Sequence, residues 1–227
     1  MERRFVPWQN TFVNSIELIV LATTKVGENA VVVHTLSREY GRRGFMVRPG
    51  KKQAMTLFLP LNILEADVVE NPKSALWSLK NILLKDGLSG IRGNLHKNTM
   101  TLFLSEVLFR TVREGVFEEG LYEWCIGSIL TLNALEADYA NFHIRFLLEL
   151  AGALGFRPTF DDVAPFAREH LQELKPFLQA GFSESMLVPL TGAARNALCD
   201  SLLQYLSYHT ESAIQVRSLA VLRELYR

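Results

Sequence analysis

Five basic side chains lie within eleven residues of one another, and their chemistry suits phosphate groups. They are Arg42, Arg43, Arg48, Lys51 and Lys52. Cationic groups on adjoining turns and strands form a positive track for a nucleic-acid backbone, and Tyr40 or Phe45 offers a base an aromatic face. Lys and Arg are also common on any surface, so a solvated turn explains the cluster equally well. The aromatic residues are more typical of a core.

Residues that could carry a reaction do not converge in the sequence. The histidines are scattered and none forms a pair at metal-ligand spacing. His143 stands among apolar neighbours, which favours a packed, hydrogen-bonded histidine. Cys125 and Cys199 lack a CxxC context, so we expect both to be small buried side chains. The sequence therefore predicts no catalytic residue, no metal and no cofactor.

The sequence pattern predicts short β-strands for the elements that must position the basic cluster. Residues 12–21, 30–35 and 45–48 are rich in β-branched and aromatic residues, with glycine-containing turns between them. The run Gly41–Gly44 is predicted to be a hairpin turn. Residues 57–69 form a further apolar stretch, in which Pro60 suits an edge position or a bulge. Close spacing of short strands is typical of a small barrel.

Helical periodicity begins near residue 94. Apolar residues at helical spacing predict helices near 100–113 and 121–135, a central helix from Asn141 to Gly155, and two more near 191–207 and 216–226. The acidic pair Asp161-Asp162 indicates a helix cap. The order predicts two segregated units, an OB-fold β-barrel at 1–80 and an all-α bundle at 81–227, with the joint inside 72–95.

Charge is unevenly distributed although the net charge is zero. Residues 1–85 hold 12 of the 24 Lys and Arg but only 7 of the 24 Asp and Glu, which leaves the remainder net acidic. This predicts that a basic face lies on the N-terminal part. Apolar runs of a few residues and two cysteines favour a cytoplasmic protein with no membrane span, no signal peptide and no disulfide framework.

Several segments resemble the RecO family of bacterial DNA repair proteins. In the N-terminal part these are Ile19-Val20-Leu21, Gly27-Glu28, residues 31–52 and residues 59–68. In the helical part, residues 102–114 are similar to the family's first long helix. Residues 140–158 (ANFHIRFLLELAGALGFRP) are similar to its central helix and following turn, and residues 216–227 resemble the ending of its Bacteroidetes-like branch. The resemblance runs through nearly the whole chain, apart from the first ten or so residues.

One departure from the family concerns zinc. Many RecO proteins follow the turn after the central helix with cysteines that hold a structural zinc ion. Here Gly155–Pro158 leads into TFDDVAPFAREH, which contains no cysteine. The zinc site is therefore not carried over, and we expect packing alone to hold this region.

The resemblance implies a recombination mediator that catalyses no covalent reaction. Members bind single- and double-stranded DNA, anneal strands, contact the tail of single-stranded DNA-binding protein, and with RecR help to load RecA. It thus implies a cytoplasmic, nucleoid-associated location. Carried over by position, DNA contact falls on Arg42, Arg43, Arg48, Lys51 and Lys52, with Lys25 as a weaker candidate.

The partner tail is acidic and ends in a hydrophobic residue, so its site should combine an apolar pocket with a cation. Candidates on the helical part are Arg110, Arg113, Arg145, Arg217 and Arg223. A surface salt bridge is the better interpretation of any single one. The surface for RecR is left open.

Two other function classes stay open. A protein–protein adaptor whose barrel does not bind nucleic acid is compatible with zero net charge, because OB-folds serve many roles. A hydrolase or transferase with a site formed by residues distant in sequence is the second. A DNA-binding assay separates the first from the mediator, and a structure without a pocket of convergent titratable groups would oppose the second.

Overall fold

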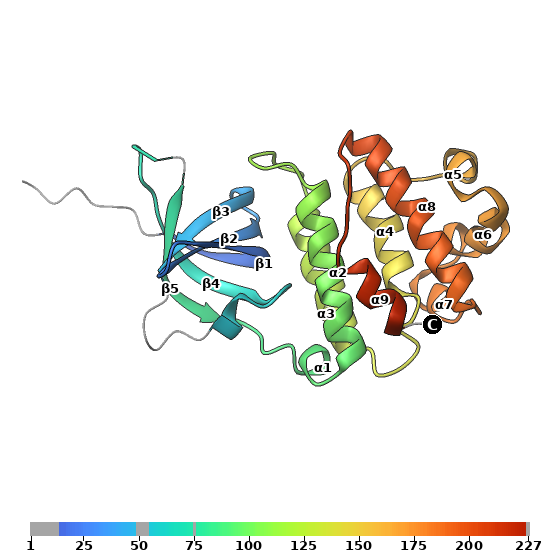
Figure 1. Ribbon diagram of the computed structural model, residues 1–227, viewed down its shortest axis with the longest axis horizontal. Coiled ribbons are helices and arrows are strands. Elements are labelled where there is room, and N and C mark those ends of the chain that lie inside the picture. The colour runs from blue at the N-terminus through green and yellow to red at the C-terminus, as the bar shows by residue number, and fades with distance from the viewer. Residues whose placement is uncertain (1–13, 49–54, 75, 226–227) are drawn as a thin grey trace, which may run out of the picture.

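The computed structural model describes residues 14–48, 55–74 and 76–225. Within these residues the N-terminal part is a closed barrel with the strand order β1-β2-β3-β5-β4 (Figure 1). The strands are β1 (Asn14–Val26), β2 (Ala30–Ser37), β3 (Gly41–Val47), β4 (Ile63–Val69) and β5 (Trp77–Leu84), with a 3₁₀ helix η1 (Met55–Phe58) before β4. The barrel confirms the predicted OB-like fold.

Strand β1 is long enough to pair with two neighbours. Residues 14–19 pair antiparallel with β4, and residues 19–26 pair antiparallel with β2. The register shifts between Val20 and Ala22, which is a bulge that lets the strand bend around the barrel. Alternate side chains such as Leu18 and Val20 are fully buried inside, together with Phe45 from β3. The β-branched runs form a barrel because every second side chain fills its interior.

The structure corrects three local predictions. The β2–β3 turn lies at Arg38–Tyr40 instead of Gly41–Gly44, so Arg42 and Arg43 are strand residues. Pro60 lies in the turn before β4, outside any strand. β5 is absent from the prediction because Asn81, at φ 50°, interrupts its alternation and leaves Leu79 and Ile82 as its buried residues.

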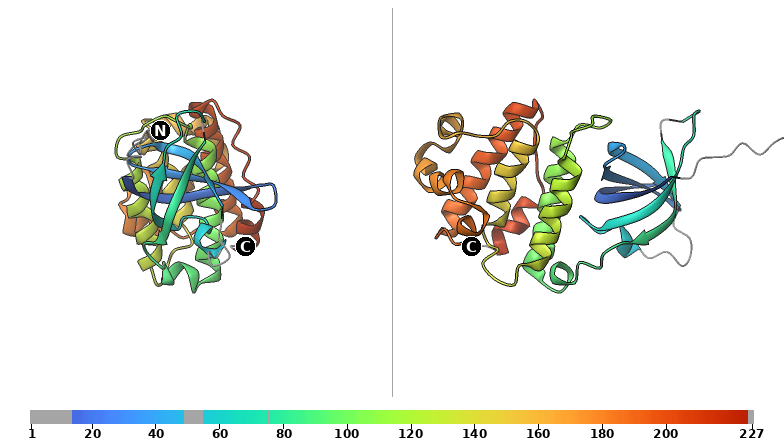
Figure 2. Two further views of the ribbon diagram at one scale, coloured as in Figure 1. Left: turned by 90° about the vertical axis from the view of Figure 1, so that its left-hand side faces the viewer. Right: turned by 180° about the vertical axis from the view of Figure 1, so that it is seen from behind.

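The C-terminal part is helical, as predicted. Its helices are α1 (Ser89–Arg92), α2 (Leu95–Thr111), α3 (Leu121–Ala134), α4 (Phe142–Ala153), α5 (Phe160–Ala167), η2 (Arg168–His170), α6 (Leu171–Gln179), α7 (Phe182–Met186), α8 (Gly192–Thr210) and α9 (Leu219–Leu225). Figure 2 shows α2 and α3 next to the barrel and α5 to α7 at the far end.

Helix α4 is the central helix that the sequence predicts, since most of its residues are buried between neighbouring helices. The predicted acidic cap is also present, because Thr159 and Asp162 form a capping box at the start of α5. Helices α5, α6 and α7 are absent from the prediction. They are short, and Pro165 and Pro176 inside α5 and α6 break the periodic signal.

The barrel and the helices share one hydrophobic core. Ile19, Leu21 and Leu36 of the barrel belong to the same buried cluster as the inward residues of α2, α3 and α4. The Arg92 guanidinium crosses this joint. It donates hydrogen bonds to the Pro60 carbonyl and Asn62 Oδ1 at 2.7 Å each, and to Asn98 Oδ1 at 2.6 Å. The two parts are therefore held at a defined angle.

The predicted division at residue 80 falls inside β5, which continues to Leu84. Residues 85–88 separate this strand from α1. We keep the division into two domains as a proposal and place the boundary at 85–88.

Replacing Arg92 tests the joint. In Arg92→Met the Pro60 carbonyl and the Asn62 amide oxygen lose their donors, and each unsatisfied buried acceptor costs about 1–3 kcal/mol. We expect the free energy of unfolding to fall by at least about 2 kcal/mol in urea denaturation. Lys73→Met, at an exposed position, is the matched control and should leave stability within about 0.5 kcal/mol of the wild type.

Candidate nucleic-acid interface

Two of the predicted DNA-contacting residues lie at the end of the barrel away from the Arg38–Tyr40 turn, which we call the outer end. Lys25 pairs with Val31 across β1 and β2, and Val31 pairs with Val47, the residue before Arg48. Both cationic side chains are exposed. Lys51 and Lys52 lie outside the described residues. The outer end thus presents two accessible cations about two strand spacings, or ~10 Å, apart.

Arg43 lies elsewhere, among aromatic side chains on the wall of the barrel. Its guanidinium carbon is 3.6 Å from the centre of the Trp77 ring, and the Tyr40 ring meets that of Trp77 edge-on at 5.4 Å. Tyr40 and Trp77 are both partly exposed. A cation beside partly exposed aromatic rings is a combination that suits a phosphate with a neighbouring base. Phe45 is fully buried, in agreement with the core interpretation of that residue.

Arg42 faces the helical part. Its side chain is 15% exposed, its guanidinium carbon is 4.9 Å from the Phe109 ring centre, and Nη2 is 3.7 Å from Glu114 Oε2. Burial lowers the pKa of Arg42, and Glu114 opposes that shift. Because these groups hold the guanidinium in the joint, Arg42 does not lie with Lys25 and Arg48 on the outer end.

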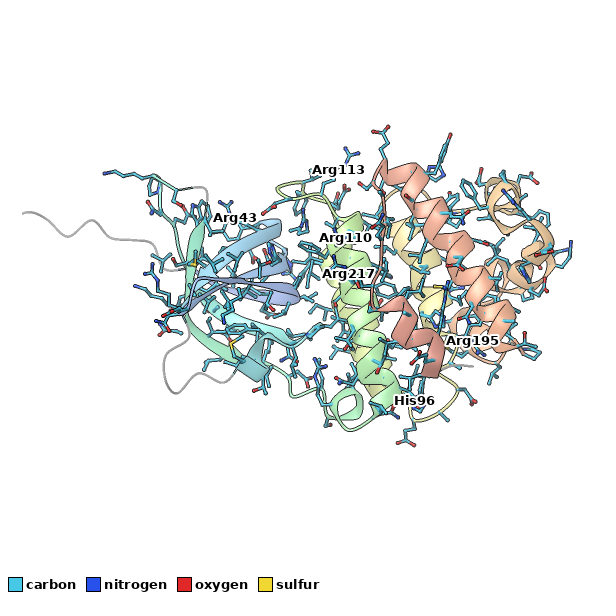
Figure 3. All side chains as sticks on the ribbon, viewed as in Figure 1. Arg43, His96, Arg110, Arg113, Arg195 and Arg217 are labelled. Carbon is cyan, nitrogen blue, oxygen red and sulfur yellow. The ribbon has the colours of Figure 1, made fainter. Side chains whose placement is uncertain are left out.

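Three of the predicted partner-binding arginines gather around the C-terminal half of α2. Arg110 lies in the last turn of that helix and Arg113 in the loop directly after it, and Arg217 precedes α9, which packs on α2 (Figure 3). Arg110 and Arg217 are exposed. Arg113 donates to the Thr210 carbonyl at 3.2 Å and lies 3.8 Å from Glu211. The group forms a basic patch on the helical part.

Glu106 holds the segment that carries Arg217. Its carboxylate accepts hydrogen bonds from the backbone N–H groups of Arg217 and Ser218, both at 3.0 Å. Burial disfavours the charged form, but these hydrogen bonds outweigh it, so the pKa of Glu106 lies below its ordinary value. The start of α9 therefore depends on an ionised carboxylate.

The other two arginines serve the helical core. Arg223 forms an ion pair with Asp200, which ties α9 to α8. Arg145 contacts Glu149 at 2.6 Å and donates to the carbonyls of Phe177 and Ala180. Arg145 also lines a cavity, so one of the five candidates meets the expected combination of an apolar pocket with a cation.

That cavity has a volume of about 430 Å³ and lies between α3, α4 and α6. Its apolar wall includes Trp124, Leu148 and Phe177, and Arg157 stands at its edge beside Gly152. Arg157 is exposed and is absent from the sequence prediction. The signal available was its place in the turn directly after the central helix, two residues beyond Gly155.

His143, Cys125 and Cys199 are sealed inside the helical part. Burial, with a contribution from Arg195, lowers the pKa of His143 to about 3, so this side chain is a neutral core histidine. Burial raises the pKa of both Cys125 and Cys199, which keeps them as thiols. No three His, Cys, Asp or Glu side chains of the described residues are grouped to hold a metal ion. None of the helices described is long and apolar enough to cross a membrane.

Comparison with known families assigns both parts of the chain. The model for the recombination protein O N terminal matches residues 14–87, and the model for the recombination protein O C terminal matches residues 92–164. This chain belongs to the RecO family. The first match covers the barrel and the second covers the helices from the end of α1 into α5, so the observed architecture and the family boundaries agree.

Relatives extend the likeness beyond residue 164. The DNA repair protein RecO of Flavobacterium psychrophilum is 26% identical over 92% of this chain and 97% of its own length. That of Bacteroides fragilis is 32% identical over 63% of this chain and 61% of its own length, and that of Porphyromonas gingivalis is 26% identical over 84% and 90%. The resemblance to RecO noted in the sequence is confirmed, and it assigns the chain to DNA repair and recombination.

The turn after α4 is held by a hydrogen bond and by ring stacking. The Tyr205 hydroxyl donates to the Phe156 carbonyl at 2.9 Å, and the Phe156 ring stacks on His209 at 5.2 Å. Packing of α5 on α8 therefore supports this turn.

The pH dependence of stability tests the role of Glu106. A lowered folded-state pKa contributes stability that is present above the unfolded pKa of about 4.3 and is lost as the pH falls through the folded value. We expect Glu106→Gln to lower the free energy of unfolding by about 1 kcal/mol at pH 7, with the difference from the wild type vanishing at low pH. Glu224→Gln, at an exposed position on α9, is the control; an equal loss in that variant would contradict the assignment.

Proposed function

We propose that this protein is a recombination mediator that binds single- and double-stranded DNA and anneals complementary strands. With RecR it helps to load RecA onto DNA coated by single-stranded DNA-binding protein, in the cytoplasm and at the nucleoid. One observation carries the proposal. Family models for both halves of RecO match this chain in order, one on the barrel and one on the helices.

The charge on the barrel supports DNA contact at the outer end. Lys25 and Arg48 are exposed there, and Lys51 and Lys52 follow Arg48 in the sequence. We propose that these four side chains bind phosphates. Arg43, with Trp77 and Tyr40 beside it, adds a place where a base of a single strand stacks. Arg42 contributes indirectly, by holding β3 against α2.

A mediator of this kind needs affinity and geometry and no nucleophile. The sealed positions of His143, Cys125 and Cys199 support a function without covalent chemistry. Exchange of DNA between partners requires contacts that form and break readily. Exposed lysine and arginine contacts to phosphates meet that requirement because they depend on counterion release.

Fluorescence anisotropy of a labelled single-stranded oligonucleotide tests the DNA site. We expect the quadruple variant Lys25→Ala/Arg48→Ala/Lys51→Ala/Lys52→Ala to bind more weakly. Each lost contact lowers the slope of log affinity against log salt by about 0.7. Lys73→Ala/Lys175→Ala, which removes two exposed lysines elsewhere, is the charge control.

The outcomes separate the function classes. Loss of both affinity and salt slope in the quadruple variant alone supports the mediator. Binding that survives unchanged would move the DNA site off the outer end. If the wild type shows no binding at low salt, the protein is an adaptor and the DNA proposal is wrong.

We also propose that the cavity beside Arg145 and Arg157 takes the acidic tail of single-stranded DNA-binding protein. The apolar wall suits the hydrophobic last residue, and the exposed Arg157 suits a carboxylate. Arg145 is bound by Glu149 and two carbonyls, so its part is to shape the wall. Arg157 supplies the positive charge, against Glu119, which also lines the cavity.

A labelled acidic peptide ending in phenylalanine tests this site. Arg157→Ala should weaken its binding about tenfold, because a hydrogen bond to a charged group contributes about 1.5–3 kcal/mol and tenfold corresponds to 1.4 kcal/mol. The protein should stay folded, since Arg157 is exposed. Arg168→Ala is the matched control on the same domain, and an equal loss there would contradict a specific pocket.

A further inference from the structure

A second surface lies where the barrel meets the helical part, on the loop between α2 and α3. This loop, residues 112–120, is fastened to the start of β3. The Gly115 N–H donates to the Arg42 carbonyl at 3.0 Å, and the Gly44 N–H donates to Glu114 Oε1 at 3.2 Å. Glu114 also adds a parallel bridge to the edge of β3. The loop therefore has a fixed path.

Gly41 allows this close approach. It has a φ of +58°, and a Cβ atom at this position would lie 2.4 Å from the carbonyl oxygen of Val116. Only glycine fits a backbone that is both left-handed and this close to another chain segment. Glycine at position 41 therefore allows the α2–α3 loop to pack directly against the start of β3.

Although the loop at 112–120 is held against β3, two of its apolar side chains are exposed to solvent. Phe117 is 63% exposed and Val116 is 40% exposed. They border a groove of about 320 Å³ that continues over Leu36 and Leu121. A rigid loop with an exposed aromatic residue over an apolar groove is the kind of feature that an interface uses as an anchor point.

Carboxylates surround this groove. Glu118, Glu119 and Glu123 line it, and Glu17, Glu39 and Glu65 line an adjoining hollow of about 250 Å³ that shares Arg38 and Tyr122 with it. Among the described residues that line the two hollows, Arg38 is the one cation. Its Nε lies 2.5 Å from Glu123 Oε1, and Glu17 forms an ion pair with Lys85, so two of these six carboxylates are neutralised. The negative charge of the rim comes from the other four, Glu39, Glu65, Glu118 and Glu119. The pKa of Tyr122 is raised by burial and also by Glu17 and Glu39, in keeping with a negative local field.

From this combination we propose that the groove is a docking surface for a basic segment of a partner protein, with an apolar side chain seated against Phe117 and Lys or Arg side chains over the glutamates. The charge identifies the occupant. DNA and acidic peptides are repelled by this rim, whereas a basic segment is attracted to it.

The location supports a site that works alongside DNA binding. The groove adjoins the Arg38–Tyr40 turn of β2 and β3, and Lys25 and Arg48 lie at the opposite end of the same strands. Strand β2 spans about 20 Å between these ends. A basic segment in the groove and a nucleic acid at the outer end therefore do not compete for the same surface. Peptide binding in the groove does not depend on the proposed DNA function.

Binding of a fluorescein-labelled peptide of alternating lysine and leucine residues tests the proposal, measured by anisotropy at low and moderate salt. The wild type should bind this probe and not a matched glutamate–leucine peptide. We expect Phe117→Ser, and separately Glu118→Lys/Glu119→Lys, to weaken binding about tenfold or more. Both changes are at surface positions, so the variants should fold, which circular dichroism checks.

Matched controls replace the same residue types elsewhere. Leu187→Ser removes an apolar side chain that is 67% exposed, and Glu169→Lys/Glu173→Lys reverses two charges on η2 and α6. Both should leave peptide binding unchanged. Phe117→Ser should also leave oligonucleotide affinity unchanged, so failure of this proposal and failure of DNA binding are read from different assays.

Three results would overturn the proposal. In the first, the wild type does not bind the basic peptide. In the second, the groove variants and the controls lose affinity for the peptide equally, which places the peptide elsewhere. In the third, sedimentation shows that Phe117→Ser abolishes self-association, which makes a second copy of the chain the occupant.

Discussion

The hydrophobic core shared by the barrel and the helices is the constraint on which the rest of the structure depends. Because Ile19, Leu21 and Leu36 are buried against helical residues, the interior of the joint is closed to any ligand. Arg92 and Arg42 are drawn into this joint, where their guanidinium groups satisfy acceptors or cover an aromatic ring. The outer end of the barrel and the rim of the joint are left for partners. Surfaces on the two parts consequently keep a fixed spacing.

Separation of charge within a neutral molecule follows from this arrangement. The formal net charge is zero, yet exposed cations stand at the outer end of the barrel and glutamates crowd the junction. Fields at a protein surface decay over about a Debye length, close to 8 Å at physiological salt. Each region therefore acts on a ligand nearly independently of the other. A net charge of zero says little about what such a protein binds, because a ligand meets one patch at a time.

The architecture could be predicted from the sequence, whereas the directions of individual side chains could not. The change from period-two to helical patterning near residue 94 predicted the barrel and the bundle, and the buried α4 was evident from apolar residues on most of its faces. β5 and helices α5 to α7 were missed where Asn81, Pro165 and Pro176 break the periodic signal. In the basic cluster the residue types alone indicated a possible phosphate-binding surface. That Arg42 turns toward Phe109 while Arg43 turns toward Trp77 follows only from strand alternation in a closed barrel, which requires the register.

A fixed joint also explains how the proposed mediator would act through binding surfaces alone. Transfer of DNA from one protein to another requires several weak contacts at fixed distances from one another. A single phosphate contact exchanges too readily to orient the DNA. Here the rigid element is the core, and the side chains that we propose to make the exchangeable contacts, such as Lys25, Arg48 and Arg157, are exposed at its edges. Loosening the joint would leave every one of these side chains intact and still remove the geometry that relates them. Coupling between the proposed surfaces should therefore be more sensitive to Arg92 than the affinity of any one surface is.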